Sequence, residues 1–206
     1  MAYGVYRGTL RALIHAMKYD GLLPLAERLG ALLAQNIVAL NMMALHDGAP
    51  PGVLLVAPVP LHGQKRRQRG FNQSELLARA AIREVRRLRP EWSVQLAPVV
   101  LHRQRATESQ AGLSPHQRRQ NLRGAFFVPR PELVAGRDML LVDDIYTTGA
   151  TARACSLALR KAGARSVWVA TLARAQREDR VVANLIPEVA MAEDVAVWTA
   201  ASQRDS

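Results

Sequence analysis

Two adjacent carboxylates, Asp143 and Asp144, follow an apolar run and precede a short turn of small and hydroxyl-bearing residues. The turn and the residues after it are Thr147, Thr148, Gly149, Ala150 and Thr151. Backbone N–H groups in such a turn, threonine hydroxyls and the N-terminus of a following helix can together bind a phosphate. The carboxylates would repel a phosphate. They are better suited to accepting hydrogen bonds from a sugar diol or to helping hold Mg²⁺ on a diphosphate.

The same segment has a structural alternative, in which the acids and threonines only end a strand and cap a helix. Neither standard nucleotide-binding motif is present, since the segment matches neither GxxxxGK[ST] nor GxGxxG. The pattern therefore predicts a phosphate and diol site of another kind.

Positive charge is the second chemical feature of the chain. It has 28 Lys and Arg residues against 17 Asp and Glu, a formal net charge of +11. Four of the basic residues lie in one segment, 62–70, which we expect to be a loop: Lys65, Arg66, Arg67 and Arg69. This charge favours anionic partners such as phosphates, nucleotides or nucleic acid. A solvated basic surface without a ligand is the open alternative.

Hydrophobic periodicity predicts the elements that position these residues. The predicted helices are 5–19, 22–45, 72–88 and 149–162, with a short one after Ser114 and Pro115. The predicted strands are 53–57, 92–100, 124–128, 138–142 and 166–172. Strands that alternate with helices indicate an α/β fold with a doubly wound, mostly parallel sheet, preceded by N-terminal helices. Ligands bind such sheets at the carboxyl ends of the strands.

The length of 206 residues allows one substantial domain or two small ones. We expect a helical segment at 1–50 packed on a core at 51–175, and an extension at 176–206 that could belong to the same domain. The single cysteine, Cys155, excludes an intrachain disulfide and is expected to be a buried structural thiol. No signal peptide or spanning helix is recognised, so the expected location is the cytoplasm, without membrane insertion.

Residues 142–151 resemble the loop that binds phosphoribosyl diphosphate (PRPP) in type I phosphoribosyltransferases. Further segments narrow the resemblance to the ComF family, over about residues 3–174. They are Tyr6-Arg7-Gly8, Leu13-Ile14, Lys18-Tyr19-Asp20-Gly21, Pro58-Val59-Pro60-Leu61, Arg69-Gly70-Phe71-Asn72-Gln73, residues 103–110 with Thr107, and Arg119-Gln120-Asn121-Leu122-Arg123-Gly124-Ala125-Phe126. ComF members commonly begin with a Cys-rich zinc module that has no counterpart here. A late start site and loss of the module are the two open explanations.

The resemblance implies roles for the matching positions. Asp143 and Asp144 would hold the ribose hydroxyls of PRPP and, indirectly, Mg²⁺, while residues 147–151 would cradle the 5′-phosphate. The segment 58–61 matches the diphosphate-binding position, for which the basic segment would supply counter-charge. Arg103, Arg105 and Gln110 are candidates in the mobile loop that closes over PRPP. A solvated basic loop is the alternative for these three.

The resemblance also implies the function. A ComF-like enzyme would transfer phosphoribose from PRPP, with Mg²⁺, to an unidentified acceptor, or act in DNA uptake during competence. The alternative is a non-catalytic PRPP sensor or accessory protein in competence or DNA repair, which would use its charge on single-stranded DNA or on a DNA-handling protein. Nucleobase salvage is a third, less favoured reading. A homodimer is compatible with all three.

Overall fold

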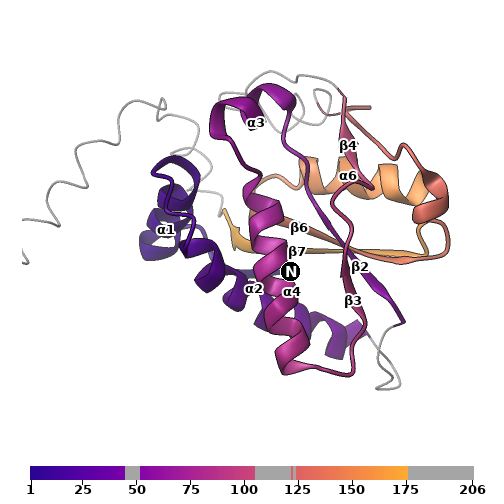
Figure 1. Ribbon diagram of the computed structural model, residues 1–206, viewed down its shortest axis with the longest axis horizontal. Coiled ribbons are helices and arrows are strands. Elements are labelled where there is room, and N and C mark those ends of the chain that lie inside the picture. Colours follow the sequence, from indigo (N-terminus) through magenta and orange to yellow (C-terminus); the bar gives the residue numbers. More distant parts are fainter. Residues whose placement is uncertain (45–51, 105–121, 123, 176–206) are drawn as a thin grey trace, which may run out of the picture.

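The computed structural model describes residues 1–44, 52–104, 122 and 124–175 of the chain (Figure 1). Its elements are β1 (Ala2–Val5), α1 (Gly8–Tyr19), α2 (Leu25–Ala44), β2 (Leu54–Pro58), α3 (Gly63–Arg69), α4 (Gln73–Leu88), β3 (Val94–Leu96), β4 (His102–Arg103), β5 (Phe126–Phe127), the 3₁₀ turn η1 (Pro131–Leu133), β6 (Asp138–Tyr146), α6 (Ala150–Lys161) and β7 (Ser166–Arg174). Five strands form one sheet in the order β1-β7-β6-β2-β3, and every pairing is parallel.

Helices cover both faces of the sheet. Alternate residues of β6 enter different cores: Leu140 and Val142 pack with α2 and α4, while Met139 and Leu141 pack with α6 and Cys155. The short antiparallel pair β4–β5 lies on the α6 side. The predicted doubly wound, parallel α/β fold is therefore confirmed, and the expected buried, structural position of Cys155 is confirmed with it.

The first element of the chain is a strand, so the prediction of a helix from residue 5 is wrong. Val5 continues the helical spacing of α1, but Ala2–Val5 pairs in parallel with the edge strand β7. The amide of Tyr6 extends this pairing by donating to the carbonyl of Arg174 at 3.0 Å. The edge of β7 thus gains backbone partners that a helix could not give it. Residues 1–44 contribute a sheet strand as well as two helices.

The basic segment is a helix, α3, where we predicted a loop. Its long unbranched residues are good helix formers. The His62 side chain accepts a hydrogen bond from the amide of Gln64 at one end, and Gly70, at φ +78°, ends the helix at the other. The predicted basic loop is therefore corrected to a capped and ordered element.

Two strands differ most in extent from the prediction, while the strands predicted at 53–57, 124–128 and 166–172 are found at Leu54–Pro58, Phe126–Phe127 and Ser166–Arg174. The strand expected over 92–100 is limited to Val94–Leu96, while β6 does not stop at Val142 but runs on to Tyr146. The acid pair thus lies within the strand and not in a turn after it. The short helix predicted after Ser114 and Pro115 and the extension at 176–206 lie outside the described residues. No helix in the described parts of the chain is long and apolar enough to cross a lipid bilayer.

Helices α2 and α4 pack closely at Gly30. A Cβ at this position would overlap that of Ala80 and come within 3.0 Å of the backbone nitrogen of Ala81. An ion pair between Glu27 and Arg83 also joins the two helices. This contact sets how closely α4, which carries residues of the site described below, lies beside α2.

We predict that Gly30→Ala destabilises the protein, although alanine is the better helix former. Propensity alone would give a gain of about 0.5–1 kcal/mol, whereas overpacking against the α4 backbone costs about 1–3 kcal/mol. Urea unfolding of the parent and variant measures the net effect. In a double-mutant cycle, Ala80→Gly should reduce the cost of Gly30→Ala. A gain in stability for Gly30→Ala alone would contradict the packing argument.

Candidate functional site

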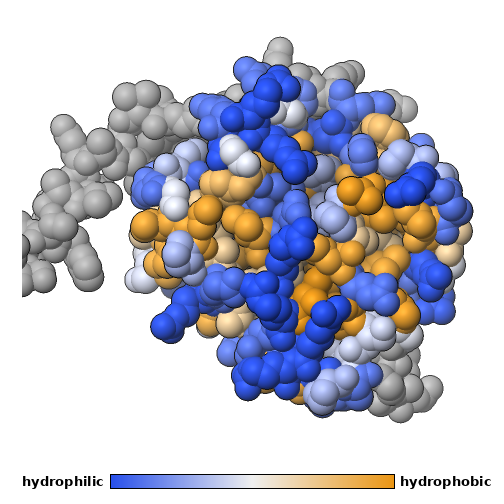
Figure 2. All heavy atoms as spheres, in the orientation of Figure 1, coloured by the Kyte–Doolittle hydropathy of each residue, from blue (hydrophilic) through white to orange (hydrophobic). Residues whose placement is uncertain are grey.

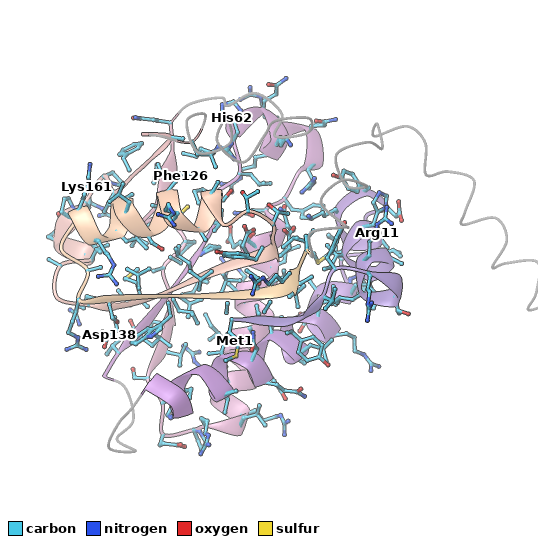
Figure 3. All side chains as sticks on the ribbon, turned by 180° about the vertical axis from the view of Figure 1, so that it is seen from behind. Met1, Arg11, His62, Phe126, Asp138 and Lys161 are labelled. Atoms are coloured by element: carbon cyan, nitrogen blue, oxygen red, sulfur yellow. The ribbon has the colours of Figure 1, made fainter. Side chains whose placement is uncertain are left out.

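The acid pair lies where the strand order reverses. The strand β2 lies between β3 and β6. The connection after β2 leads to β3 on one side, and the connection after β6 leads to β7 on the other side. Ligands of open α/β sheets bind at such a switch point, outside the carboxyl ends of the strands. Pairing with β2 stops at Val142, and beyond it Asp143 and Tyr146 pair with β7. Figure 3 shows Asp138, the first residue of β6, at the opposite end of the sheet from α1 and its Arg11.

Asp143 is held by groups from two elements. Its Oδ1 accepts a hydrogen bond from the Ser74 hydroxyl of α4 at 3.0 Å and one from the amide of Asp144 at 3.0 Å. Burial, and then the negative charge of Asp144, raises the pKa of the Asp143 carboxyl to about 7, against the opposing effect of Lys18. This carboxyl therefore exchanges its proton near neutral pH.

Asp144 is buried against a cation from the N-terminal part of the chain. The Nζ atom of Lys18, on α1, lies 2.6 Å from Asp144 Oδ2, and both side chains are largely shielded from solvent. Burial alone would lower the pKa of Lys18, but the attraction of Asp144 outweighs it and the pKa is raised. The pair is therefore a stable ion pair that ties α1 to β6.

Arg103 lies close to the acid pair, on the face opposite to Lys18. Successive residues of a strand point to opposite faces, so Asp143 points to the side of α6 and Asp144 to that of α1. Burial lowers the pKa of Arg103, and the Asp143 charge opposes this shift. The guanidinium lies 5.4 Å from the ring centroid of Phe126, beside α6 (Figure 3). Arg103, a candidate for the mobile loop, is the last residue of the short strand β4. Arg105 and Gln110 lie outside the described residues.

The turn after β6 leads directly into α6. Gly149 adopts φ +75° before the first residue of α6, and as a glycine it has no side chain with which to cap this helix. The Thr148 hydroxyl accepts from the amide of Ala150 at 3.3 Å, which narrows the turn. The positive end of α6 and the hydroxyls of residues 147–151 therefore meet just beyond the acid pair, as expected of a phosphate cradle.

Gly149 also has a structural role that the sequence did not indicate. A Cβ here would lie 2.6 Å from Cζ of the Tyr146 ring, and the positive φ is strained for any other residue. A substitution at Gly149 would thus disturb the folded turn even without a ligand. A variant at position 149 therefore cannot separate a phosphate cradle from a structural turn.

The segment between α3 and α4 connects β2 to the acid pair. Asn72 caps α4 by accepting from the Ser74 amide at 3.1 Å, and its Nδ2 donates to the carbonyl of Val59 at 3.1 Å. Arg69 donates to the Gln73 side chain at 2.7 Å and lies over the Tyr19 ring. This segment therefore places Ser74 within hydrogen-bond distance of Asp143, and the contacts of Arg69 stabilise the segment.

The other three residues of the basic segment have a different setting. The side chains of Lys65, Arg66 and Arg67 are exposed on α3. In Figure 2 hydrophilic side chains cover α3 and continue along the outer face of α4, with apolar side chains on both sides of this band. The four predicted counter-charges therefore have two different settings. Arg69 contacts Gln73 and Tyr19, whereas Lys65, Arg66 and Arg67 form an exposed basic group on α3.

The acid pair fits the Mg²⁺ implied by the resemblance. Mg²⁺ takes oxygen ligands and usually combines one or two carboxylates with substrate phosphates and water. Within the described ranges, no three His, Cys, Asp or Glu side chains gather as a metal cluster, so the protein would supply part of the coordination. Asp144 is already neutralised by Lys18, which makes Asp143 the more suitable donor.

Sequence reasoning missed Lys18 and Ser74 as site residues. Lys18 appeared only among the residues that carry the resemblance, and Ser74 did not appear at all. A signal for Lys18 was available, because it lies four residues after the buried Ile14 and so on the buried side of α1. A cation at such a position requires a buried counter-charge.

We predict that Asp143→Asn changes how stability depends on pH. Folding raises the pKa of Asp143 from 3.8 to about 7, so between these values the native state keeps a proton that the unfolded chain has lost. The stability of the parent therefore falls through this group as pH rises across the window. The variant should gain stability relative to the parent from pH 4.5 to 7, by about 1.4 kcal/mol per unit of pKa elevation, and hold that gain above pH 7. Urea unfolding at each pH measures it.

The matched control is Asp138→Asn, at the other end of β6. Hydrogen bonds from Arg165, and secondarily from Ser166, lower the pKa of Asp138 despite its partial burial. Its carboxylate stabilises the fold above its unfolded pKa, and that contribution is lost as pH falls. This variant should be less stable than the parent at neutral pH. A pH-independent difference between Asp143→Asn and the parent would contradict the assigned carboxyl environment.

Comparisons with known proteins identify the family. Residues 72–201, more than half of the chain, match the family model described as phosphoribosyl transferase domain. The chain is 35% identical over 172 residues to the DNA utilization protein YhgH of Escherichia coli O157:H7, covering 82% of this chain and 69% of that protein. It is 37% identical over 123 residues to competence protein F of Haemophilus influenzae, covering 58% of this chain and 50% of that protein.

Among solved structures, the chain is similar to the hypoxanthine-guanine phosphoribosyltransferase of Schistosoma mansoni in complex with IMP. The identity is 16% and the TM-score 0.39, over 73% of this chain and 56% of that one. The family match and the identity to YhgH carry the conclusion: the chain belongs to the ComF family of type I phosphoribosyltransferases.

Proposed function

We propose that this protein binds PRPP with Mg²⁺ and transfers its phosphoribosyl group to an acceptor. One observation carries the proposal: the acid pair on β6 is fixed by Ser74 and Lys18, and the strand leads through a short turn into helix α6, whose N-cap residue is a glycine. Carboxylates suit the ribose hydroxyls, and the N-terminus of α6 suits a phosphate. PRPP carries both groups on adjacent parts of one molecule.

The reaction needs positioning and charge compensation more than covalent chemistry. The bond between C1′ and the diphosphate oxygen breaks, and its electron pair leaves with the diphosphate. C1′ gains oxocarbenium character and bonds to the acceptor, whose proton passes to solvent. Asp143 and Asp144 would orient the ribose and the first turn of α6 would hold the 5′-phosphate, so that C1′ is presented in one position.

Charge on the leaving group is the second requirement. Mg²⁺, when bound, neutralises part of the charge of the diphosphate. The exposed cations of α3, which follows β2, would add to this neutralisation. Arg103 would do the same from the side of α6. Arginine suits paired contacts with phosphate oxygens, whereas Lys65 would act as a point charge.

We predict that Asp143→Asn combined with Asp144→Asn weakens PRPP binding about a hundredfold or more in the presence of Mg²⁺. The double variant loses two charge-assisted hydrogen bonds, each worth about 1.5–3 kcal/mol. Calorimetric titration measures the affinity, and circular dichroism confirms that the variant is folded. Asp138→Asn is the control: it removes another carboxylate from β6, lowers stability and should leave the affinity for PRPP unchanged. A folded double variant with the parent's affinity would overturn the site assignment.

A second candidate function is a PRPP-binding accessory role in DNA handling, without transfer. Two observations favour it: the relatives named above are a DNA utilization protein and a competence protein, and α3 exposes three consecutive cations. In this case α3 would contact the phosphates of single-stranded DNA, and PRPP would act as a signal.

This second function predicts a salt-dependent affinity for single-stranded DNA. Replacing Lys65, Arg66 and Arg67 by alanine should flatten the dependence of log K on log salt by about 0.7 for each phosphate that the variant no longer neutralises. Fluorescence anisotropy with a labelled oligonucleotide measures the slope. A parent protein with no slope would exclude this role of α3.

The control for that measurement removes the same charge elsewhere. Arg79, Arg83 and Arg87 on α4 are each paired with a glutamate. Their replacement by alanine should leave the salt slope close to that of the parent. An equal effect of the two triple variants would indicate general attraction by net charge and no specific DNA surface on α3.

A further inference from the structure

The ion pair with Asp144 uses only part of what the Lys18 side chain offers. The Nζ atom of Lys18 lies 2.6 Å from Asp144 Oδ2, and the side chain is 14% exposed. Among the described residues, Asp144 is the one carboxylate in an ion pair with Lys18. An ammonium group carries three N–H donors. Contact with one carboxylate oxygen leaves donors available for a further acceptor.

Lys18 also lines a pocket of about 260 Å³ between the end of α1 and helix α3. Gly21, Gln68 and Arg69 are further residues of its lining, and no acidic side chain is among the described residues that line it. The helix α3 follows β2, and Lys18 contacts an acid near the end of β6. An anionic group in this pocket would therefore meet Lys18 beside the acid pair without meeting a carboxylate in the lining.

The geometry of PRPP indicates which of its groups would come to this side. In the ribose ring, C1′ and the carbon that carries C5′ lie on opposite sides of the ring oxygen. A 5′-phosphate at the first turn of α6 would therefore direct C1′ and its diphosphate away from α6. Asp143 points to the side of α6 and Asp144 to that of α1, where Lys18 contacts it. The diphosphate would thus extend from the acid pair toward Lys18.

We propose that Lys18 binds the diphosphate of PRPP while it also holds Asp144, so that one ammonium group serves both the ribose-binding acid and the leaving group. The inference rests on the proposed function. It deepens that function by assigning a diphosphate contact to a residue outside 72–201, the part of the chain that matches the family model.

This contact would act during the transfer itself. When the bond from C1′ to the diphosphate oxygen breaks, its electron pair leaves with the diphosphate. An ammonium group that Asp144 already holds in position would stabilise this charge as it develops, without reorganising first. The structural alternative is that Lys18 only neutralises Asp144 and makes no contact with the ligand.

Removal of the whole ion pair separates the two roles. Lys18→Met combined with Asp144→Asn leaves the net charge of the protein unchanged, and loss of a buried pair as a unit is tolerated better than loss of one partner. Calorimetry with inorganic diphosphate and Mg²⁺ measures the affinity, and circular dichroism checks the fold. We expect this double variant to bind diphosphate about tenfold or more weakly than the parent, as for a lost charge-assisted hydrogen bond. If Lys18 only neutralises Asp144, the affinity should stay at the parent value.

The matched control removes the ion pair at the other end of β6. Asp138→Asn combined with Arg165→Met also leaves the net charge unchanged and should keep the parent's affinity for diphosphate. The single variant Asp144→Asn frees Lys18 from its counterion, so it should bind inorganic diphosphate more tightly than the parent, although its affinity for PRPP falls.

A second measurement uses the parent protein. The chain contains three lysines, Lys18, Lys65 and Lys161, so NMR of lysine labelled with ¹³C at Cε gives few signals. The Lys18 signal is the one lost in Lys18→Met. We expect it to shift on addition of diphosphate and Mg²⁺ and to saturate at the affinity that calorimetry gives. The signal of Lys161, the last residue of α6, should not move.

The outcomes distinguish the inference from the proposed function. If the parent does not bind PRPP with Mg²⁺, the proposed function fails and the role of Lys18 fails with it. If the parent binds PRPP, the inference alone is overturned by an unchanged diphosphate affinity in the variant without the Lys18–Asp144 pair. It is also overturned by a Lys18 signal that does not shift, by a parent that does not bind inorganic diphosphate, or by an equal loss of affinity in the control.

Discussion

Two carboxylates side by side on one strand repel each other, and burial deprives both of hydration, so the fold must provide compensating groups. Lys18 provides one from α1 and Ser74 the other from α4. These two contacts determine much of the surrounding structure. Asn72 caps α4 and binds the turn after β2, which fixes the position of Ser74, and the close packing at Gly30 holds α4 against α2. The helices on the α1, α2 and α4 side of the sheet thus supply a compensating group to each carboxylate.

The compensation is unequal, and this inequality is chemically useful. Asp144 has a buried ammonium group as its partner, whereas Asp143 has a hydroxyl and an amide, which stabilise a charge less than a cation does. Asp143 therefore has a raised pKa. A ligand that brings hydroxyl donors or a cation to this carboxyl would relieve the cost. Perturbed acids of this kind gather at functional sites, where local stability is exchanged for binding.

Local patterns in the sequence predict those parts of the fold that depend on local interactions. The helical spacing over residues 72–88 places α4 correctly, and the apolar run before Asp143 identifies the central strand. The failures have tertiary causes. Ala2–Val5 becomes a strand because β7 offers an edge, and β6 continues past Val142 because β7 pairs with it there. The adjacent acids could be recognised by type and spacing, but no local pattern shows that Lys18, far away in the sequence, would neutralise one of them.

The ion pair between Lys18 and Asp144 makes α1 part of the candidate site. A chain that began after this helix would leave Asp144 buried without its counterion, which is costlier than the loss of the pair as a whole. It would also lose β1 and uncover the edge of β7. Any segment joined in front of Met1 is accordingly connected, through one strand and one helix, to the carboxylate at the centre of the site.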